Sequence, residues 1–181
     1  MPKLLSTEQM AEFANSGCLF FEGLIDEDIN KEFLNDIGHT DIDDVDNIQH
    51  YFQNIKSSSS IPRIPAGTAL KDAYPLNSPL EKIFKNEIVS GAINSLVGSK
   101  TVVDHQFLHL TFPSKYYAKA NQRQMSQVNH QDSTIDPRTT FDIQLFYFPT
   151  AVTKEMGGTR YIPGTHLRIV NEMGIAKYQN I

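Results

Sequence analysis

The first part of the chain carries two short stretches in which apolar residues recur at helical spacing. Ser6 and Gln9 have the spacing of a capping box at the start of the first stretch, and Gly17 is placed to end it. Asp26 can cap the second stretch, which closes at Gly38. The pattern therefore predicts two helices of about ten residues each.

The strongest helical pattern begins at Ser78-Pro79, where serine suits the cap and proline suits the first turn. It runs to Gly98. The apolar stripe consists of Leu80, Ile83, Phe84, Ile88, Ala92, Ile93 and Leu96. We expect one continuous helix over 78–98, packed through this stripe.

Beyond Gly98 the hydrophobic period changes from about 3.6 residues to about 2. The stretch "TVVDHQFLHLTF" (101–112) places Val102, Asp104, Gln106, Leu108 and Leu110 on one face and Val103, His105, Phe107, His109 and Thr111 on the other. This alternation predicts a strand, and "FDIQLFYF" (141–148) and "TRYIP" (159–163) predict two more. A fourth short buried strand is expected at "CLFFEGLI" (18–25).

Helices thus come mainly first and strands follow, which indicates the α+β class. We expect a single domain over 1–181, with a mainly helical region at 1–98 and the first strands of a sheet at 99–181. Between them, the acidic and then serine-rich stretch from Thr40 to Ser60 has few apolar residues and reads as a surface loop.

Composition narrows the functional classes. With 40% hydrophobic and 20% charged residues, the chain has the balance of a soluble globular protein. The net charge of −5 offers no basic field, so we expect no nucleic-acid partner, and no stretch approaches a membrane span. Cys18 is the single cysteine, set in an apolar run, which favours a buried thiol and a reducing, cytoplasmic location.

The stretch "VNHQDSTIDPR" (128–138) contains a possible metal-binding pair, His130 and Asp132. Random placement of 6 His and 12 Asp in 181 residues yields about 0.4 His-x-Asp triplets, so the triplet alone carries no weight. His39-Thr40-Asp41 has the same spacing in the acidic loop. On a strand, however, alternation would turn His130 and Asp132 to the same face, about 6.5–7 Å apart along the chain.

An imidazole and a carboxylate, completed by a second imidazole, form the facial triad of non-haem iron(II) oxygenases. The order of motifs supports this chemistry: "HQD" at 130–132, the strand at 141–148 and then "GGTRYIPGTH" at 157–166. In that order and spacing they resemble the phytanoyl-CoA dioxygenase family. That family has an HxD strand, an aliphatic-aromatic strand and a Gly-Gly element ending in Pro-Gly-Ser-His, which reads Pro-Gly-Thr-His here.

The resemblance implies a double-stranded β-helix, a cupin-like jelly-roll with N-terminal helices. It implies Fe(II) held by His130 and Asp132, 2-oxoglutarate as co-substrate, and hydroxylation by O2 of a small organic or acyl substrate. Gln144 is a candidate for contact with 2-oxoglutarate. In the family the third metal ligand, a distal His, and the Arg that pairs with 2-oxoglutarate follow much further downstream. We therefore expect the 181 residues to be the N-terminal part of the jelly-roll.

For several other residues a catalytic or metal-binding role is possible from the sequence but less favoured. The family treats the position of His166 as structural, although His166 is the only histidine after Asp132 and so remains an alternative third ligand. His105 and His109 share one strand face and could bind metal, but a lining role fits better. Tyr147 and Tyr161 are expected in the core or at a rim rather than in catalysis. Arg160 is expected in solvent, with contact to an anionic substrate as the alternative.

Two other functions stay open from the sequence. A non-catalytic jelly-roll fragment that binds a partner would lack the distal His and Arg. A metal-binding cupin would use His130 and Asp132 without 2-oxoglutarate. A downstream His and Arg would distinguish an oxygenase from the first alternative, and the response of metal binding to 2-oxoglutarate distinguishes it from the second.

Overall fold

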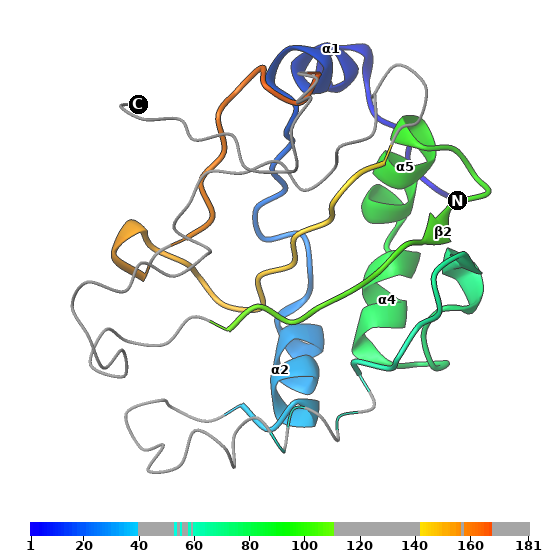
Figure 1. The fold of residues 1–181 in the computed structure, drawn as a ribbon, viewed down its shortest axis with the longest axis vertical. Coiled ribbons are helices and arrows are strands. Elements are labelled where there is room, and N and C mark those ends of the chain that lie inside the picture. Colours follow the sequence, from blue (N-terminus) through cyan, green and yellow to red (C-terminus); the bar gives the residue numbers. More distant parts are fainter. Residues whose placement is uncertain are drawn as a thin grey trace, which may run out of the picture.

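The fold is drawn from a computed structural model, which describes residues 1–39, 53, 55, 58, 60–110, 142–156 and 158–167. Its elements, in chain order, are α1 (Thr7–Ser16), α2 (Glu27–Asp36), β1 (Thr68–Ala69), η2 (Leu70–Asp72), α4 (Pro79–Lys85), α5 (Glu87–Leu96), β2 (Val102–Val103) and η5 (Lys154–Met156). Among the described residues the α-helices all precede β2, and extended chain follows it (Figure 1).

The first two predicted helices are confirmed. α1 has the full capping box: the Ser6 hydroxyl accepts from the Gln9 N–H, and the Gln9 side chain accepts from the Ser6 N–H. It ends at Gly17, whose φ of 80° is left-handed, and the Gly17 N–H donates to the Phe13 carbonyl. α2 begins after Asp26, whose side chain makes no capping hydrogen bond, and it buries Phe33.

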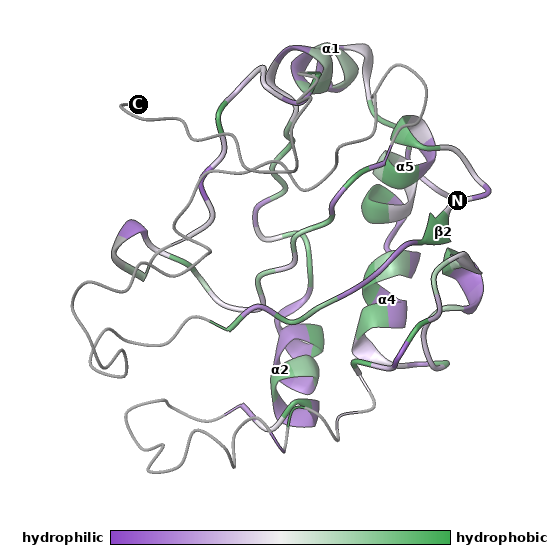
Figure 2. Cartoon of the chain, in the orientation of Figure 1, coloured by the Kyte–Doolittle hydropathy of each residue, from purple (hydrophilic) through white to green (hydrophobic). Residues whose placement is uncertain are grey.

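The long helix expected over 78–98 is two helices. Asn86, with φ −52° and ψ 133°, breaks the helical path between α4 and α5. The Asn86 Oδ1 then accepts hydrogen bonds from the N–H groups of Ile88 and Val89, so the same residue caps α5. The apolar stripe survives the break, with Ile83 in α4 and Ile93 in α5 both buried. Figure 2 shows α5 as mainly hydrophobic and α2 as mixed.

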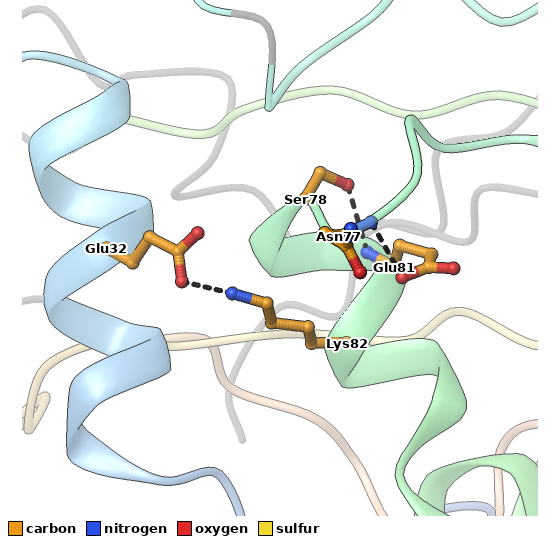
Figure 3. A network of polar contacts seen from close by, with 5 residues as sticks. All are labelled: Glu32, Asn77, Ser78, Glu81 and Lys82. Carbon is orange, nitrogen blue, oxygen red and sulfur yellow. Dashed lines mark hydrogen bonds and ion pairs between the residues drawn. The ribbon is translucent and has the colours of Figure 1, made fainter.

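α2 and α4 pack side by side and are joined by a polar network (Figure 3). The Lys82 ammonium lies 2.5 Å from the Glu32 carboxylate across the two helices. At the start of α4 the Ser78 hydroxyl accepts from the Glu81 N–H, and the Glu81 carboxylate accepts from the Asn77 N–H. Ser78 is thus the cap that the sequence predicts, and this network fixes where α4 begins.

The predicted strands form only in small part. β1 and β2 pair antiparallel, with Thr68 opposite Val103 and Ala69 opposite Val102. The remainder of the first predicted strand, 104–110, is extended chain without a ladder, and so are the described residues of the second and third. The prediction at 18–25 is wrong: no strand forms there, and the Phe20 side chain is 67% exposed.

The described residues are therefore α+β with few strands, and the jelly-roll that the resemblance implies is not formed by them. A core cluster of Phe33, Ile37 and Ile55 lies under the extended segments. Ile55 belongs to the stretch read as a surface loop, so the end of that stretch is not all surface. Ser60 shows this too: it is buried, and its N–H donates to the Asp36 carboxylate at 2.7 Å.

Candidate active site

The predicted metal ligands His130 and Asp132 lie outside the described residues, within 111–141. The structure instead describes the two segments that flank them in sequence, 102–110 and 142–148.

Both flanking segments rest on the same core. Leu108 and Leu110 from the first segment and Tyr147 from the second all pack against the cluster that contains Phe33. The Tyr147 ring meets the Phe33 ring edge-on, with centroids 5.3 Å apart, and its hydroxyl donates to the Asn30 Oδ1 at 2.6 Å. The helical layer thereby contacts the chain before residue 111 and after residue 141, on either side of the stretch that contains the HQD triplet in sequence.

Gln106 provides a polar anchor for the first segment. Its Nε2 donates to the Pro62 carbonyl, and its Oε1 accepts from the Tyr74 hydroxyl at 3.0 Å. Burial raises the pKa of Tyr74 and that of Tyr147 to about 12, because the phenolate would lose hydration. Both hydroxyls therefore stay protonated at neutral pH and serve as hydrogen-bond donors, which supports the structural reading of Tyr147.

The opposite sides of the two segments carry aromatic and imidazole rings. His105 stacks on Phe107 with centroids 5.7 Å apart, and His109 meets Phe107 edge-on at 5.5 Å. In the second segment Phe146 and Phe148 are stacked at 6.4 Å. Gln144, the candidate for 2-oxoglutarate contact, is exposed on this segment. His105 also pairs with the Asp104 carboxylate at 2.7 Å.

The Pro-Gly-Thr-His turn docks on the C-terminal end of α1. The Gly164 N–H donates to the Ser16 carbonyl at 2.9 Å. The His166 ring lies against Gly17, where a Cβ would come within 2.4 Å of the His166 Nδ1, and its centroid is 6.1 Å from that of Phe13. His166 is therefore a packing residue of the α1 terminus. Sequence reasoning assigned Gly17 to the helix end alone, because nothing local signals so distant a partner.

Three or more metal-binding side chains do not gather anywhere in the part of the chain that the structure describes. His105, His109 and His166, the alternative ligands, accordingly form no metal cluster there. The imidazole and carboxylate of His130 and Asp132 remain a donor set that suits Fe(II).

The remaining candidate residues are Cys18, Tyr161 and Arg160. Burial, with the nearby Glu12 charge, raises the pKa of the Cys18 thiol, which disfavours the nucleophilic thiolate. Tyr161 packs on Phe20 with centroids 5.7 Å apart and is 46% exposed, as expected for a rim residue. Arg160 is exposed. No helix of the described residues has the length and apolar character needed to cross a membrane.

Comparison with known proteins gives one result. The sequence model of the phytanoyl-CoA dioxygenase (PhyH) family matches residues 13–179, which include both flanking segments, the HQD triplet and the Pro-Gly-Thr-His turn. Neither the curated proteins nor the solved structures yield a significant match. Because the match spans nearly all of its 181 residues, the chain belongs to the phytanoyl-CoA dioxygenase family, whose members are in general Fe(II)- and 2-oxoglutarate-dependent oxygenases.

Proposed function

We propose that the protein is an Fe(II)/2-oxoglutarate-dependent dioxygenase that hydroxylates a small organic or acyl substrate. The balanced reaction is R–H + O2 + 2-oxoglutarate → R–OH + succinate + CO2. The observation that carries the proposal is the position of His130-Gln131-Asp132 inside the region that matches the family, between two segments anchored on one core.

In this proposal His130 and Asp132 hold the iron through one imidazole nitrogen and one carboxylate. The iron and 2-oxoglutarate supply the oxidising chemistry, and the protein supplies binding and orientation. Gln144 is proposed to donate a hydrogen bond from its amide to a 2-oxoglutarate oxygen. Tyr147, three residues further along, supports this role because its hydrogen bond to Asn30 limits how far the segment can shift.

The anchors also bear on catalysis. A reacting group displaced by about 1 Å can lose roughly 100-fold in rate, so the segments that precede and follow the ligands in sequence need firm support. Gln106 gives that support through part-buried hydrogen bonds to Pro62 and Tyr74, and Tyr147 through a part-buried hydrogen bond to Asn30 of α2. Neither residue needs to contact substrate for this purpose.

The test is Fe(II) binding measured by anaerobic calorimetric titration with and without 2-oxoglutarate, followed by succinate release in air. We expect His130→Ala and Asp132→Ala each to weaken Fe(II) binding and reduce succinate release by roughly 100-fold or more. His39→Ala is the matched control because His39 heads the other His-x-Asp triplet. It should leave both quantities at the wild-type level.

Two results would overturn the proposal. Iron binding that is indifferent to 2-oxoglutarate, with no succinate formed, would indicate a metal-binding cupin. Equal iron affinity in wild type and His130→Ala would remove the HQD triplet from the site and favour a non-catalytic interaction module.

A further inference from the structure

Among the described α-helices, α1 alone has no buried residue, whereas α2, α4 and α5 each bury apolar side chains. α2 packs on α4 and α4 packs on α5, but α1 packs closely on no other helix or strand of the described residues. Figure 1 shows α1 at the upper edge of the molecule. Because buried apolar surface is the main source of stability, the contacts at the two ends of α1 decide how firmly it is held.

The N-terminal end of α1 is attached to α5. Residues 3–5, which we call the strap, lead directly into the N-cap of α1. The Lys3 N–H donates to the Glu87 carbonyl at 2.8 Å, and the Leu5 N–H donates to the Ser95 hydroxyl at 3.0 Å. A Cβ at Gly91 would lie 1.8 Å from the Lys3 carbonyl oxygen, so the strap backbone rests directly on the backbone of α5.

The C-terminal end of α1 is attached to the Pro-Gly-Thr-His turn. The Gly164 N–H donates to the Ser16 carbonyl at 2.9 Å, and the centroid of the His166 ring lies 6.1 Å from that of Phe13. The buried His166 Nδ1 has no hydrogen-bond partner among the described residues. A buried polar atom without a partner costs free energy, so this attachment is weaker than its close packing suggests.

We propose that the strap is a latch: when it leaves α5, α1 and the Pro-Gly-Thr-His turn move away with it as one unit, while α2, α4 and α5 stay packed. Elements with few buried apolar contacts open at a lower free energy than the whole fold, which favours this partial opening. Opening frees the side of α5 at Gly91 and releases the turn, so an event at the N-terminal strap reaches a segment far along the chain. The inference is independent of the proposed oxygenase function.

Native-state hydrogen exchange, measured by NMR on the full chain, tests the latch. The reporters are the Met10 N–H in α1 and the Gly164 N–H in the turn, both of which are hydrogen-bonded. Ser95→Ala removes the acceptor of the Leu5 N–H and should speed exchange at both reporters by the same factor, roughly 3- to 10-fold. Gly91→Ala, which places a Cβ beneath the strap, should speed both by roughly 10-fold or more.

Two controls separate opening of this unit from unfolding of the whole protein. Asn94→Ala removes a polar side chain beside Ser95 in the same helix and should leave both reporters unchanged. Ile83→Val weakens the core at a side chain that is 2% exposed. It should speed the slowest amides of α4 and α5 roughly 3- to 10-fold and leave Met10 and Gly164 unchanged, because the core is intact in the closed and the open form.

The coupling between strap and turn must also be reciprocal. His166→Ala loosens the turn and should speed exchange of the Lys3 N–H by the same factor as that of Gly164. Different factors at Met10 and Gly164, or unchanged exchange in both strap variants, would overturn the inference. So would an effect of Asn94→Ala equal to that of Ser95→Ala, or an equal effect of Ile83→Val on the reporters and on the core.

Discussion

Gly17 has two structural roles: it ends α1, and it makes room for the His166 ring. Its φ of 80° ends α1, and its missing Cβ leaves room for the His166 ring. Gly17→Ala adds a left-handed strain and an overlap at 2.4 Å, so we expect a loss of about 2–3 kcal/mol in the free energy of unfolding. Urea denaturation followed by circular dichroism measures this loss.

Gly23→Ala is the control for this prediction. Gly23 has a φ of 62°, and a Cβ there would meet no atom within 4 Å, so only the backbone strain of about 1 kcal/mol applies. Equal losses at the two glycines would show that the contact with His166 contributes nothing to stability.

Gly91 behaves differently because it lies inside a helix, where alanine is normally preferred by about 0.5–1 kcal/mol. A Cβ at Gly91 would lie 1.8 Å from the Lys3 carbonyl oxygen, since the N-terminal segment crosses α5 at this point. The Lys3 N–H donates to the Glu87 carbonyl at 2.8 Å, and the Leu5 N–H to the Ser95 hydroxyl at 3.0 Å. We expect Gly91→Ala to lower the free energy of unfolding by about 1–3 kcal/mol.

The sign should reverse when the crossing segment is removed. In a variant that lacks residues 2–5, Gly91→Ala should stabilise the protein by about 0.5–1 kcal/mol, as in an ordinary helix. A double-mutant cycle by thermal unfolding measures this coupling. Additive effects would contradict the predicted contact between Lys3 and Gly91.

At the level of secondary structure, Asn86 is the single residue that separates α4 from α5. Asn86→Ala removes the acceptor for the Ile88 and Val89 N–H groups, and we expect a loss of about 1 kcal/mol in the free energy of unfolding. Asn94→Ala, inside α5, makes the same chemical change away from a cap and should be neutral or slightly stabilising. Urea denaturation of both variants gives the comparison, and equal effects would rule out the capping role.

Most helix ends could be predicted from the local sequence, for a physical reason. A capping box, a proline in the first turn and a glycine at the end act over one helical turn, so Ser6, Ser78 and Gly17 could be assigned directly. The break at Asn86 has no counterpart in the hydrophobic pattern, because the apolar stripe continues across it from α4 to α5. Alternation placed Leu108 and Leu110 on one face, and only the structure shows that this face packs on the core; a strand also needs a neighbour with which to form hydrogen bonds.

At the scale of the whole molecule, the helical layer and the extended segments are joined by two tyrosines. Each has a pKa raised to about 12, against about 10 in the unfolded chain. The stability that their protonated forms contribute is fully present below pH 10 and is lost as the pH rises from about 10 to about 12. The free energy of unfolding should therefore fall over this range.

Tyr147→Phe should make the free energy of unfolding fall less steeply with pH, because one proton fewer is released on unfolding. It should also lower the free energy of unfolding at neutral pH by about 1 kcal/mol, because Asn30 loses its hydrogen-bond donor. Chemical denaturation at a series of pH values from 9 to about 12 tests both effects. Tyr161→Phe is the control, since Tyr161 is 46% exposed. If both variants kept the wild-type slope, the half-buried Tyr147 hydroxyl would not be the source of the alkaline loss.

The sequence by itself determined the caps at Ser6 and Ser78, the end of α1 at Gly17, the period-2 pattern of the segment at 102–110, and a metal-binding hypothesis at His130 and Asp132. These features depend on near neighbours in the chain, and the membership of the family was likewise readable from ordered motifs. Only the tertiary structure decided that His166 packs on Gly17 and that Tyr147 bonds Asn30. Such contacts join residues far apart in sequence, and their geometry follows from how the layers pack, which no local pattern encodes.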